Sequence, residues 1–231
     1  MYNESLWIGS MVVSLFTVII AYKLFGRIGL YIWTATAVII ANIQVFKLVE
    51  VFGLETALGN VVYASIFLAT DILNENHSRK DAQKAVWIGF FVLISVTIIM
   101  QITLLFKPSP NDVTGDSISN IFSLMPRVAV ASLTAYLVSQ SHDVWFFAGL
   151  KDKHKKKLLW FRNNLSTITS QTIDNIIFTL IAFVGLLDWD IIAQIFITSL
   201  ILKVIVAIFD TPFMYLARKI KSQKSSFCII R

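Results

Sequence analysis

The sequence predicts an all-α membrane protein, a polytopic helical bundle of about seven transmembrane helices. Of its 231 residues, 56% are hydrophobic and 15% are charged, and the mean hydropathy is +0.72. Soluble domains average about 45–50% apolar and about 25% charged residues. The apolar runs are about 20 residues long and lack period-2 alternation, which fits helices crossing a hydrocarbon core of about 30 Å and not barrel strands. Helices satisfy every backbone polar group internally, as lipid requires.

Seven segments are long enough to cross the membrane once each. They cover residues 6–25, 28–49, 54–73, 86–106, 118–141, 165–187 and 191–216. The gaps between them are too short for a soluble domain, so we expect one integral membrane domain over residues 1–231.

The basic residues predict the orientation of these spans. Sixteen of the 20 Lys and Arg lie in alternate connections or after the last span, whereas the opposite connections hold only Lys107. The other three, Lys47, Arg127 and Lys203, fall inside spans. Cytoplasmic loops of membrane proteins carry an excess of Lys and Arg. The N-terminus is therefore expected outside and the C-terminus in the cytoplasm of a multi-pass protein of the cytoplasmic membrane.

Several classes of function are disfavoured by the residue content. The net charge of +6 is spread over loops between hydrophobic runs, so contacts with anionic lipid headgroups are expected and nucleic acid is not. The single Cys228 allows no intrachain disulfide. The sequence has no zinc-protease, serine-hydrolase or Walker motif. We expect no catalytic residues, no metal and no cofactor; any energy must come from an ion gradient, the solute's own gradient or a separate ATPase.

Ionisable groups inside the spans are the candidates for function. Each costs at least about 2.5–3.5 kcal/mol at membrane depth, and the sequence has six of them: Lys47, Asp71, Arg127, Asp174, Lys203 and Asp210. They could pair across helices and merely hold the bundle together. Lys47 lies near a span end, where it could snorkel, and Glu50 is a partner three residues on along the same expected helical face.

The sixth span carries a polar stripe that points to a lined pocket. Its polar residues recur every three or four positions: Asn163, Thr167, Ser170 and Asp174, with Gln171 and Asn175 beside them. This spacing places them on one helical face. Such a face must either form hydrogen bonds with neighbouring helices or line a water-filled cavity. The third span repeats the pattern in Asn60, Tyr63, Phe67 and Asp71. Carboxylates, amides and aromatic faces suit a flat nitrogenous ring, and they would suit a vitamin or an amino acid too.

Two dense blocks of residues match a known family. The first block comprises residues 41–43 (ANI), Lys47, 67–75 (FLATDILNE) and 85–90 (AVWIGF). The second comprises 139–140 (SQ), 143–144 (DV), 159–164 (LWFRNN), 166–167 (ST), 170–171 (SQ), Asp174 and 181–183 (IAF), followed by Lys203. Over about residues 40–215 the chain resembles the queuosine precursor transporter family, also called the vitamin uptake transporter family. After Glu75, this chain has Asn76-His77-Ser78 where many members have x-Tyr-Gly.

The resemblance implies a function and a fold. The function is import of 7-deazaguanine bases such as 7-cyano-7-deazaguanine, 7-aminomethyl-7-deazaguanine or queuine, by secondary transport. Two alternatives are a solute-capture subunit of a multi-component vitamin importer with an external ATPase, and a non-transporting scaffold or sensor. The implied core is similar to the six-helix substrate-binding subunits of energy-coupling-factor importers. On that basis residues 1–27 form an additional helix, 28–217 the family core and 218–231 a basic cytoplasmic tail.

The expected site follows from the stripe and the resemblance together. Asp174 is expected to bind ring N–H donors, and the other expected substrate-binding residues are Gln171, Asn175, Asn42, Asp71, Gln140 and Asn163. The basic residues Arg127, Lys203 and Lys47 are expected to balance buried carboxylates or to move protons. The expected partners are the deazapurine base and membrane lipid, and homo-oligomers remain open.

Overall fold

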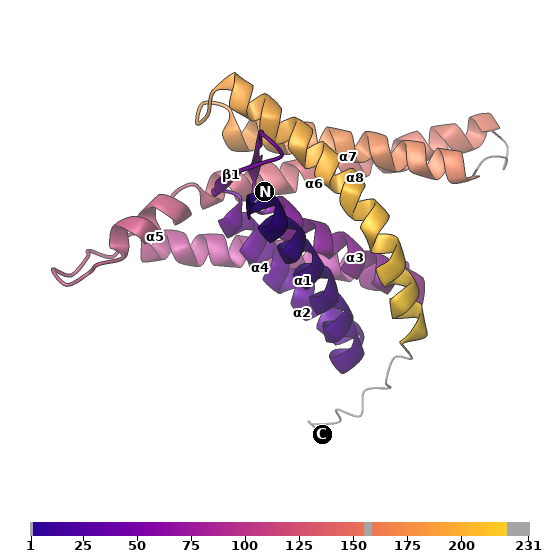
Figure 1. The fold of residues 1–231 in the computed structure, drawn as a ribbon, viewed down its shortest axis with the longest axis horizontal. Coiled ribbons are helices and arrows are strands. Elements are labelled where there is room, and N and C mark those ends of the chain that lie inside the picture. The colour runs from indigo at the N-terminus through magenta and orange to yellow at the C-terminus, as the bar shows by residue number, and fades with distance from the viewer. Residues whose placement is uncertain (1, 155–158, 221–231) are drawn as a thin grey trace.

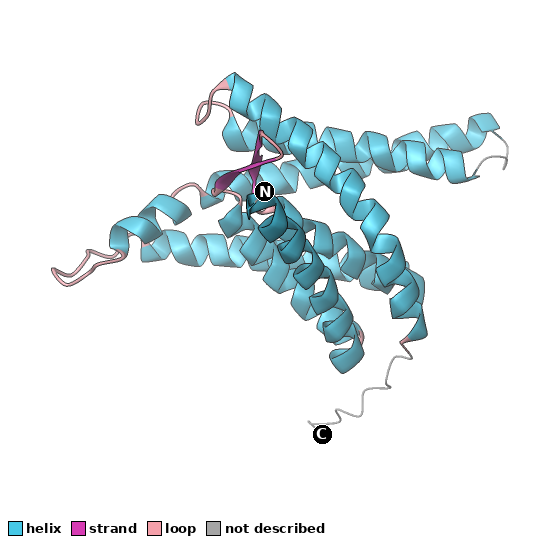
Figure 2. Cartoon of the chain, in the orientation of Figure 1, coloured by secondary structure: helices cyan, strands magenta, loops and turns pink. Residues whose placement is uncertain are grey.

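Helices make up most of the chain in the computed structural model, which describes residues 2–154 and 159–220 (Figure 1). Side chains are described throughout 2–139 and 172–203 and at single positions elsewhere. The elements are α1 (Tyr2–Phe25), α2 (Arg27–Gln44), β1 (Leu48–Val51), β2 (Leu54–Ala57), α3 (Asn60–Asn76), α4 (Arg79–Thr103), α5 (Gly115–Phe122), α6 (Met125–His154), α7 (Leu159–Phe183) and α8 (Trp189–Lys219). Figure 2 shows one small strand pair among these helices.

Three helical segments in the described part are long and apolar enough to cross a membrane alone. They are Tyr2–Phe25, Arg79–Thr103 and Gly115–Ser139, and Thr172–Phe183 is a shorter apolar helix. Large apolar side chains on α4 also face outward, with Trp87 62% and Phe91 71% exposed. Exposed apolar surface of this extent is what lipid covers. The prediction of a helical membrane protein is confirmed at this level, and the count of seven spans stays a prediction.

Several predicted boundaries were wrong. The second span was expected to run to residue 49 and the third to begin at 54, but α2 ends at Gln44 and α3 begins at Asn60. The residues between them form an antiparallel hairpin that pairs Leu48 with Ala57 and Val51 with Leu54. The fifth span is divided into α5 and α6. A short apolar run does not by itself distinguish a strand from the end of a helix, and this ambiguity concealed the hairpin.

Hydrogen bonds between distant segments define two opposite ends of the bundle. At one end, Asn3 Nδ2 donates to the Glu50 carbonyl at 2.9 Å, and the Glu55 amide donates to Gln194 Oε1 at 3.1 Å. The N-terminus, the hairpin and the start of α8 therefore lie together, as Figure 1 also shows. At the other end, Asn76 Nδ2 donates to the Tyr22 hydroxyl at 3.2 Å and to the Ala217 carbonyl at 3.3 Å. Helices α1, α3 and α8 thus run between the same two ends.

Three groups of buried apolar side chains hold these helices together. The first joins α1, α3 and α8, the second joins α2, α3, α4 and α6, and the third joins the hairpin, α6, α7 and the start of α8. Helices α6 and α7 lie side by side, and α8 crosses from the end of α7 to the end of α3 (Figure 1). The first and second groups share α3, the second and third share α6, and the first and third share α8, so the three groups adjoin one another.

The hairpin turn predicts a stabilising substitution at Phe52. Phe52 has a φ of 55° and the following Gly53 a φ of 76°, the two-residue turn for which Asn-Gly is preferred. A left-handed conformation costs an ordinary L-residue about 1–2 kcal/mol, and Asn tolerates it better. Since the Phe52 side chain is 63% exposed, Phe52→Asn should raise the free energy of unfolding by about 1 kcal/mol, measured as a higher Tm in detergent.

The matched control for this substitution is Phe106→Asn. Phe106 is 75% exposed and does not have a positive φ, so the same chemical change should bring no gain there. Equal effects of the two substitutions on Tm would show that the turn conformation contributes nothing.

Candidate functional site

A polar cavity lies between five helices, close to the hairpin end of the bundle. Its described lining comes from α2, the start of α3, and α6, α7 and α8: Ala41, Asn42, Val45, Gly59, Asn60, Tyr63, Ser132, Ala135, Asp174, Asn175, Phe178 and Lys203. The cavity measures about 40 Å³, within about 500 Å³ of empty space that includes its open mouth. By this measure one water takes about 10–15 Å³, so the closed cavity has room for about three waters.

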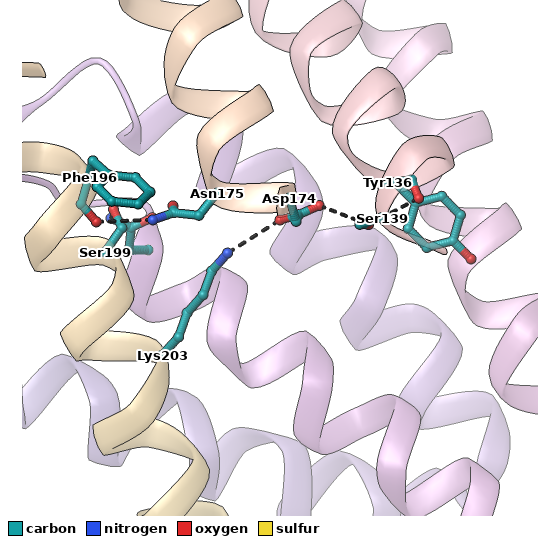
Figure 3. Close-up of polar contacts among 8 residues, drawn as sticks. Tyr136, Ser139, Asp174, Asn175, Phe196, Ser199 and Lys203 are labelled. Carbon is teal, nitrogen blue, oxygen red and sulfur yellow. Dashed lines mark hydrogen bonds and ion pairs between the residues drawn. The ribbon is translucent and has the colours of Figure 1, made fainter. Parts of the chain in front are cut away.

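An ion pair forms the charged part of the cavity wall (Figure 3). Lys203 Nζ on α8 lies 3.2 Å from Asp174 Oδ2 on α7, and their side chains are only 12% and 18% exposed. The Ser139 hydroxyl on α6 lies 3.4 Å from Asp174 Oδ1 and 3.1 Å from the Tyr136 carbonyl. A hydroxyl has one proton to donate, so the shorter contact competes for it. Asp174 is therefore incompletely hydrogen-bonded by its described neighbours.

Amide hydrogen bonds between helices position the helices around this pair. Asn175 Nδ2 donates to the Phe196 carbonyl at 3.0 Å, which joins α7 to α8. Asn60 Nδ2 donates to Ser199 Oγ at 2.7 Å, which joins α3 to α8. Asn42 Nδ2 donates to the Val38 carbonyl at 2.7 Å, within α2 itself. Each of these amides thus donates one hydrogen bond to a neighbouring backbone carbonyl or serine hydroxyl. The two bonds that join helices position α8, which carries Lys203, against α3 and α7.

Two aromatic side chains complete the lining. Tyr63 and Phe178 border the cavity, and each is held by an edge-to-face contact, with ring centroids 5.5 Å from Phe67 and 6.2 Å from Phe183. Such contacts orient aromatic rings. The cavity therefore combines aromatic surface with one carboxylate and one ammonium, which suits a flat solute with polar edges.

A single glycine allows α2 and α3 to meet at this wall. A Cβ at Gly59 would lie 2.3 Å from the Ala41 carbonyl oxygen, closer than any real Cβ contact. Since both residues line the cavity, only glycine permits the observed approach of the two helices.

The structure brings some of the predicted site residues together. Asn42, Asp174, Asn175 and Lys203 all border the cavity. Gln140, Gln171 and Asn163 lie on helical backbone, but their side chains fall outside the described residues. Their expected roles remain predictions.

Two other predicted residues lie elsewhere. Asp71 is exposed, about three turns along α3 from Asn60, and does not border the cavity. Lys47 lies just before β1, where its carbonyl accepts from the Leu58 amide at 3.0 Å. The expected helical pairing of Lys47 with Glu50 was wrong, because Glu50 belongs to β1.

Arg127 has a different position from the one expected. Its Nε donates to the Ile181 carbonyl at 2.6 Å, and its guanidinium also donates to the Val184 carbonyl. These carbonyls lie at the C-terminal end of α7, where a cation satisfies unpaired acceptors and the helix dipole. Arg127 therefore anchors α6 to the end of α7, and its described hydrogen bonds reach no carboxylate.

Four polar or aromatic lining residues were absent from the predicted site: Asn60, Tyr63, Ser132 and Phe178. The sequence spacing could have identified three of them. Asn60 and Tyr63 share one helical face with Asp71, and Phe178 follows Asp174 by one turn. Ser132 stands among small residues of α6, and no sequence pattern distinguishes it.

Comparison with known proteins agrees with the sequence blocks described above. A family model described as "Putative vitamin uptake transporter" matches residues 57–217. The chain belongs to this transporter family. The matched residues of this vitamin uptake transporter homologue include α3 to α8. Asp174 and Lys203 are thus inside the family region, whereas Asn42 precedes it.

Two relatives have the same printed name, "Probable queuosine precursor transporter". The protein of Bacillus subtilis (strain 168) is 42% identical over 220 residues, which cover 95% of this chain and 96% of the relative. The protein of Haemophilus influenzae (strain ATCC 51907 / DSM 11121 / KW20 / Rd) is 28% identical over 132 residues, which cover 57% of this chain and 54% of the relative. No solved structure matches this member of the vitamin uptake transporter family.

Proposed function

We propose that this protein imports queuosine precursors across the cytoplasmic membrane as a secondary transporter. The substrates would be 7-deazaguanine bases, such as 7-cyano-7-deazaguanine, 7-aminomethyl-7-deazaguanine or queuine. The observation that carries the proposal is the carboxylate of Asp174, held at a cavity between membrane helices in a chain of this family. The name shared by the two relatives supports the same substrates.

The cavity offers the groups that such a base requires. The Asp174 carboxylate can accept two N–H groups of the base, as carboxylates do for paired donors. Tyr63 and Phe178 offer ring surfaces against which the base can lie. Asn175 and Asn42 stand beside these groups and would contact the remaining edge. Gln171, Gln140 and Asn163 are retained as further contacts on α6 and α7.

The charges at the two ends of the bundle support an orientation. The end that holds Tyr22 and Asn76 also holds Arg27 and Arg79, whereas the hairpin end holds Glu50 and Glu55 together with Lys47. Basic residues favour the cytoplasmic side. In the proposed orientation the hairpin end, near which the cavity lies, faces the outside, where the precursor is collected.

Import can be tested in a bacterium that neither synthesises nor imports queuosine precursors. The protein is expressed there, each precursor is fed separately, and queuosine in tRNA is measured. Queuosine should appear only in cells that express the protein and receive a transported precursor. Absence of queuosine with every precursor, while the protein is present in the membrane, would contradict the proposal.

The transport mechanism needs a second assay, with purified protein alone in liposomes. A secondary transporter should move labelled precursor without any added ATPase. Import in cells combined with none in liposomes under any ion gradient would instead support a capture subunit that depends on an external ATPase.

A further inference from the structure

Lys203 is a nearly buried cation with few hydrogen-bond partners among the described residues. Its ammonium can donate three hydrogen bonds, yet among the described residues it has one acceptor, Asp174 Oδ2 at 3.2 Å. The side chain is 12% exposed and borders the cavity. Buried charges are normally paired and fully hydrogen-bonded, because leaving them unsatisfied is costly. Lys203 thus holds donors toward a space that a solute can enter.

Among the described residues, Asp174 also has few hydrogen-bond partners. Its Oδ2 contacts Lys203, and its Oδ1 has one described contact, at 3.4 Å with Ser139 Oγ. Figure 3 shows Asp174 between these two partners, with the Ser139 hydroxyl also close to Tyr136. An ionised carboxylate has about four acceptor positions. Carboxylate and ammonium therefore stand side by side, one able to accept further bonds and the other able to donate them.

The inner part of the cavity is too small for a whole fused two-ring base while Lys203 and Asp174 are paired. Its 40 Å³ suffices for about three waters, and such a base is several times larger than a water. Something must move when the base binds. Asn60 and Asn175 are each fixed by a bond to α8, whereas the ammonium of Lys203 sits on a flexible four-carbon stem. Lys203 is the wall residue that can move most easily.

We propose that Lys203 contacts the substrate and selects it by its ring carbonyl. On binding, the Lys203 ammonium leaves Asp174 Oδ2 and donates to the carbonyl oxygen of the base, while ring N–H donors of the base take its place on Asp174. No proton is transferred in this exchange. The inference rests on the proposed function and assigns a specific role to Lys203.

The exchange implies a preference that can be measured. A 7-deazaguanine edge presents a carbonyl acceptor next to N–H donors, as guanine does. The matching 2,6-diamino base presents an amino group in place of the carbonyl, and the ring nitrogen between its two amino groups carries no hydrogen. An ammonium has no acceptor, so Lys203 would face a donor. Sites built to bond one polar group reject analogues that lack it, and we expect at least about tenfold weaker binding of the diamino base.

The test uses purified full-length protein and displacement of labelled 7-cyano-7-deazaguanine by 7-deazaguanine or by its 2,6-diamino counterpart. The wild type should prefer 7-deazaguanine at least about tenfold. Lys203→Met should reduce this ratio at least about threefold, leaving the part that Asp174 contributes because the diamino base lacks a ring N–H. Lys203→Arg, which keeps a cationic donor, should restore most of the ratio. A merely structural role for Lys203 would alter stability and overall affinity but not the ratio.

Two further variants keep the test decisive. Ile197→Ala, on an exposed position of α8, should leave the ratio at the wild-type value. If Lys203→Met does not fold, Lys203→Gln replaces it and should give an intermediate ratio. A wild-type ratio in folded Lys203→Met or Lys203→Gln would overturn the inference while leaving the proposed function intact. Failure of the wild type to bind any deazaguanine would overturn both.

Discussion

Asp174→Ala is expected to abolish uptake of labelled 7-cyano-7-deazaguanine without removing the protein from the membrane. Asp174 supplies the one carboxylate among the described residues that border the cavity. A hydrogen bond to a charged group contributes about 1.5–3 kcal/mol. Loss of two such bonds predicts at least about a hundredfold weaker binding. The measurement is the initial uptake rate, normalised to the amount of protein in the membrane fraction.

The control for this prediction must separate lost recognition from lost folding. Asp174→Ala leaves the Lys203 cation nearly buried without its partner at 3.2 Å, which costs stability. The double variant Asp174→Ala with Lys203→Met removes both charges and should recover abundance but not uptake. Asp116→Ala removes an exposed carboxylate on α5 and should transport normally. Uptake near the wild-type rate in Asp174→Ala would refute the site assignment.

Arg127→Met is expected to destabilise the protein instead of changing its substrate affinity. The substitution leaves the carbonyls of Ile181 and Val184 at the end of α7 without their donors. Unsatisfied buried acceptors cost about 1–3 kcal/mol each. For the two acceptors we therefore expect a loss of about 2–6 kcal/mol in the free energy of unfolding. Thermal unfolding in detergent, followed by precursor binding below the new Tm, separates the two effects.

Two companion variants define the role of Arg127. Arg127→Lys keeps the charge but not the planar fork, so its Tm should fall between the wild type and Arg127→Met. Arg79→Met removes an exposed cation from the first turn of α4 and should leave Tm almost unchanged. Full stability of Arg127→Met together with lost binding would contradict a scaffold role and support the functional role that the sequence had suggested for Arg127.

The helical elements could be predicted from the sequence because hydropathy decides them. Runs of about 20 apolar residues produce α1 and α4 with little dependence on neighbours. The hairpin between α2 and α3 could not be predicted, because its residues are as apolar as a helix end and its turn depends on a left-handed Phe52. Its bonds to Gln194 and Thr198 on α8 are also tertiary, and no local pattern encodes them.

The sequence predicted the chemical groups of the candidate site better than it predicted which residues line it. The free-energy cost of placing a charge at membrane depth identified Asp174 and Lys203 as candidate functional residues. The structure shows that they form an ion pair with each other. The same argument also selected Arg127 and Asp71, because the cost of burying a charge does not show which group the charge will contact. In the structure, Arg127 donates to carbonyls at the end of α7, and Asp71 lies exposed on α3, far from the cavity. Only three-dimensional contacts separate these cases.

The central claim is that the cavity binds a deazaguanine base through Asp174, and thermal unfolding of the purified protein tests it most directly. A ligand that binds the folded state raises Tm in a concentration-dependent way. With 7-cyano-7-deazaguanine in excess, the wild type should show a clear rise in Tm, and Asp174→Asn should show none. An equal rise in both proteins, or no rise in the wild type, would contradict the account.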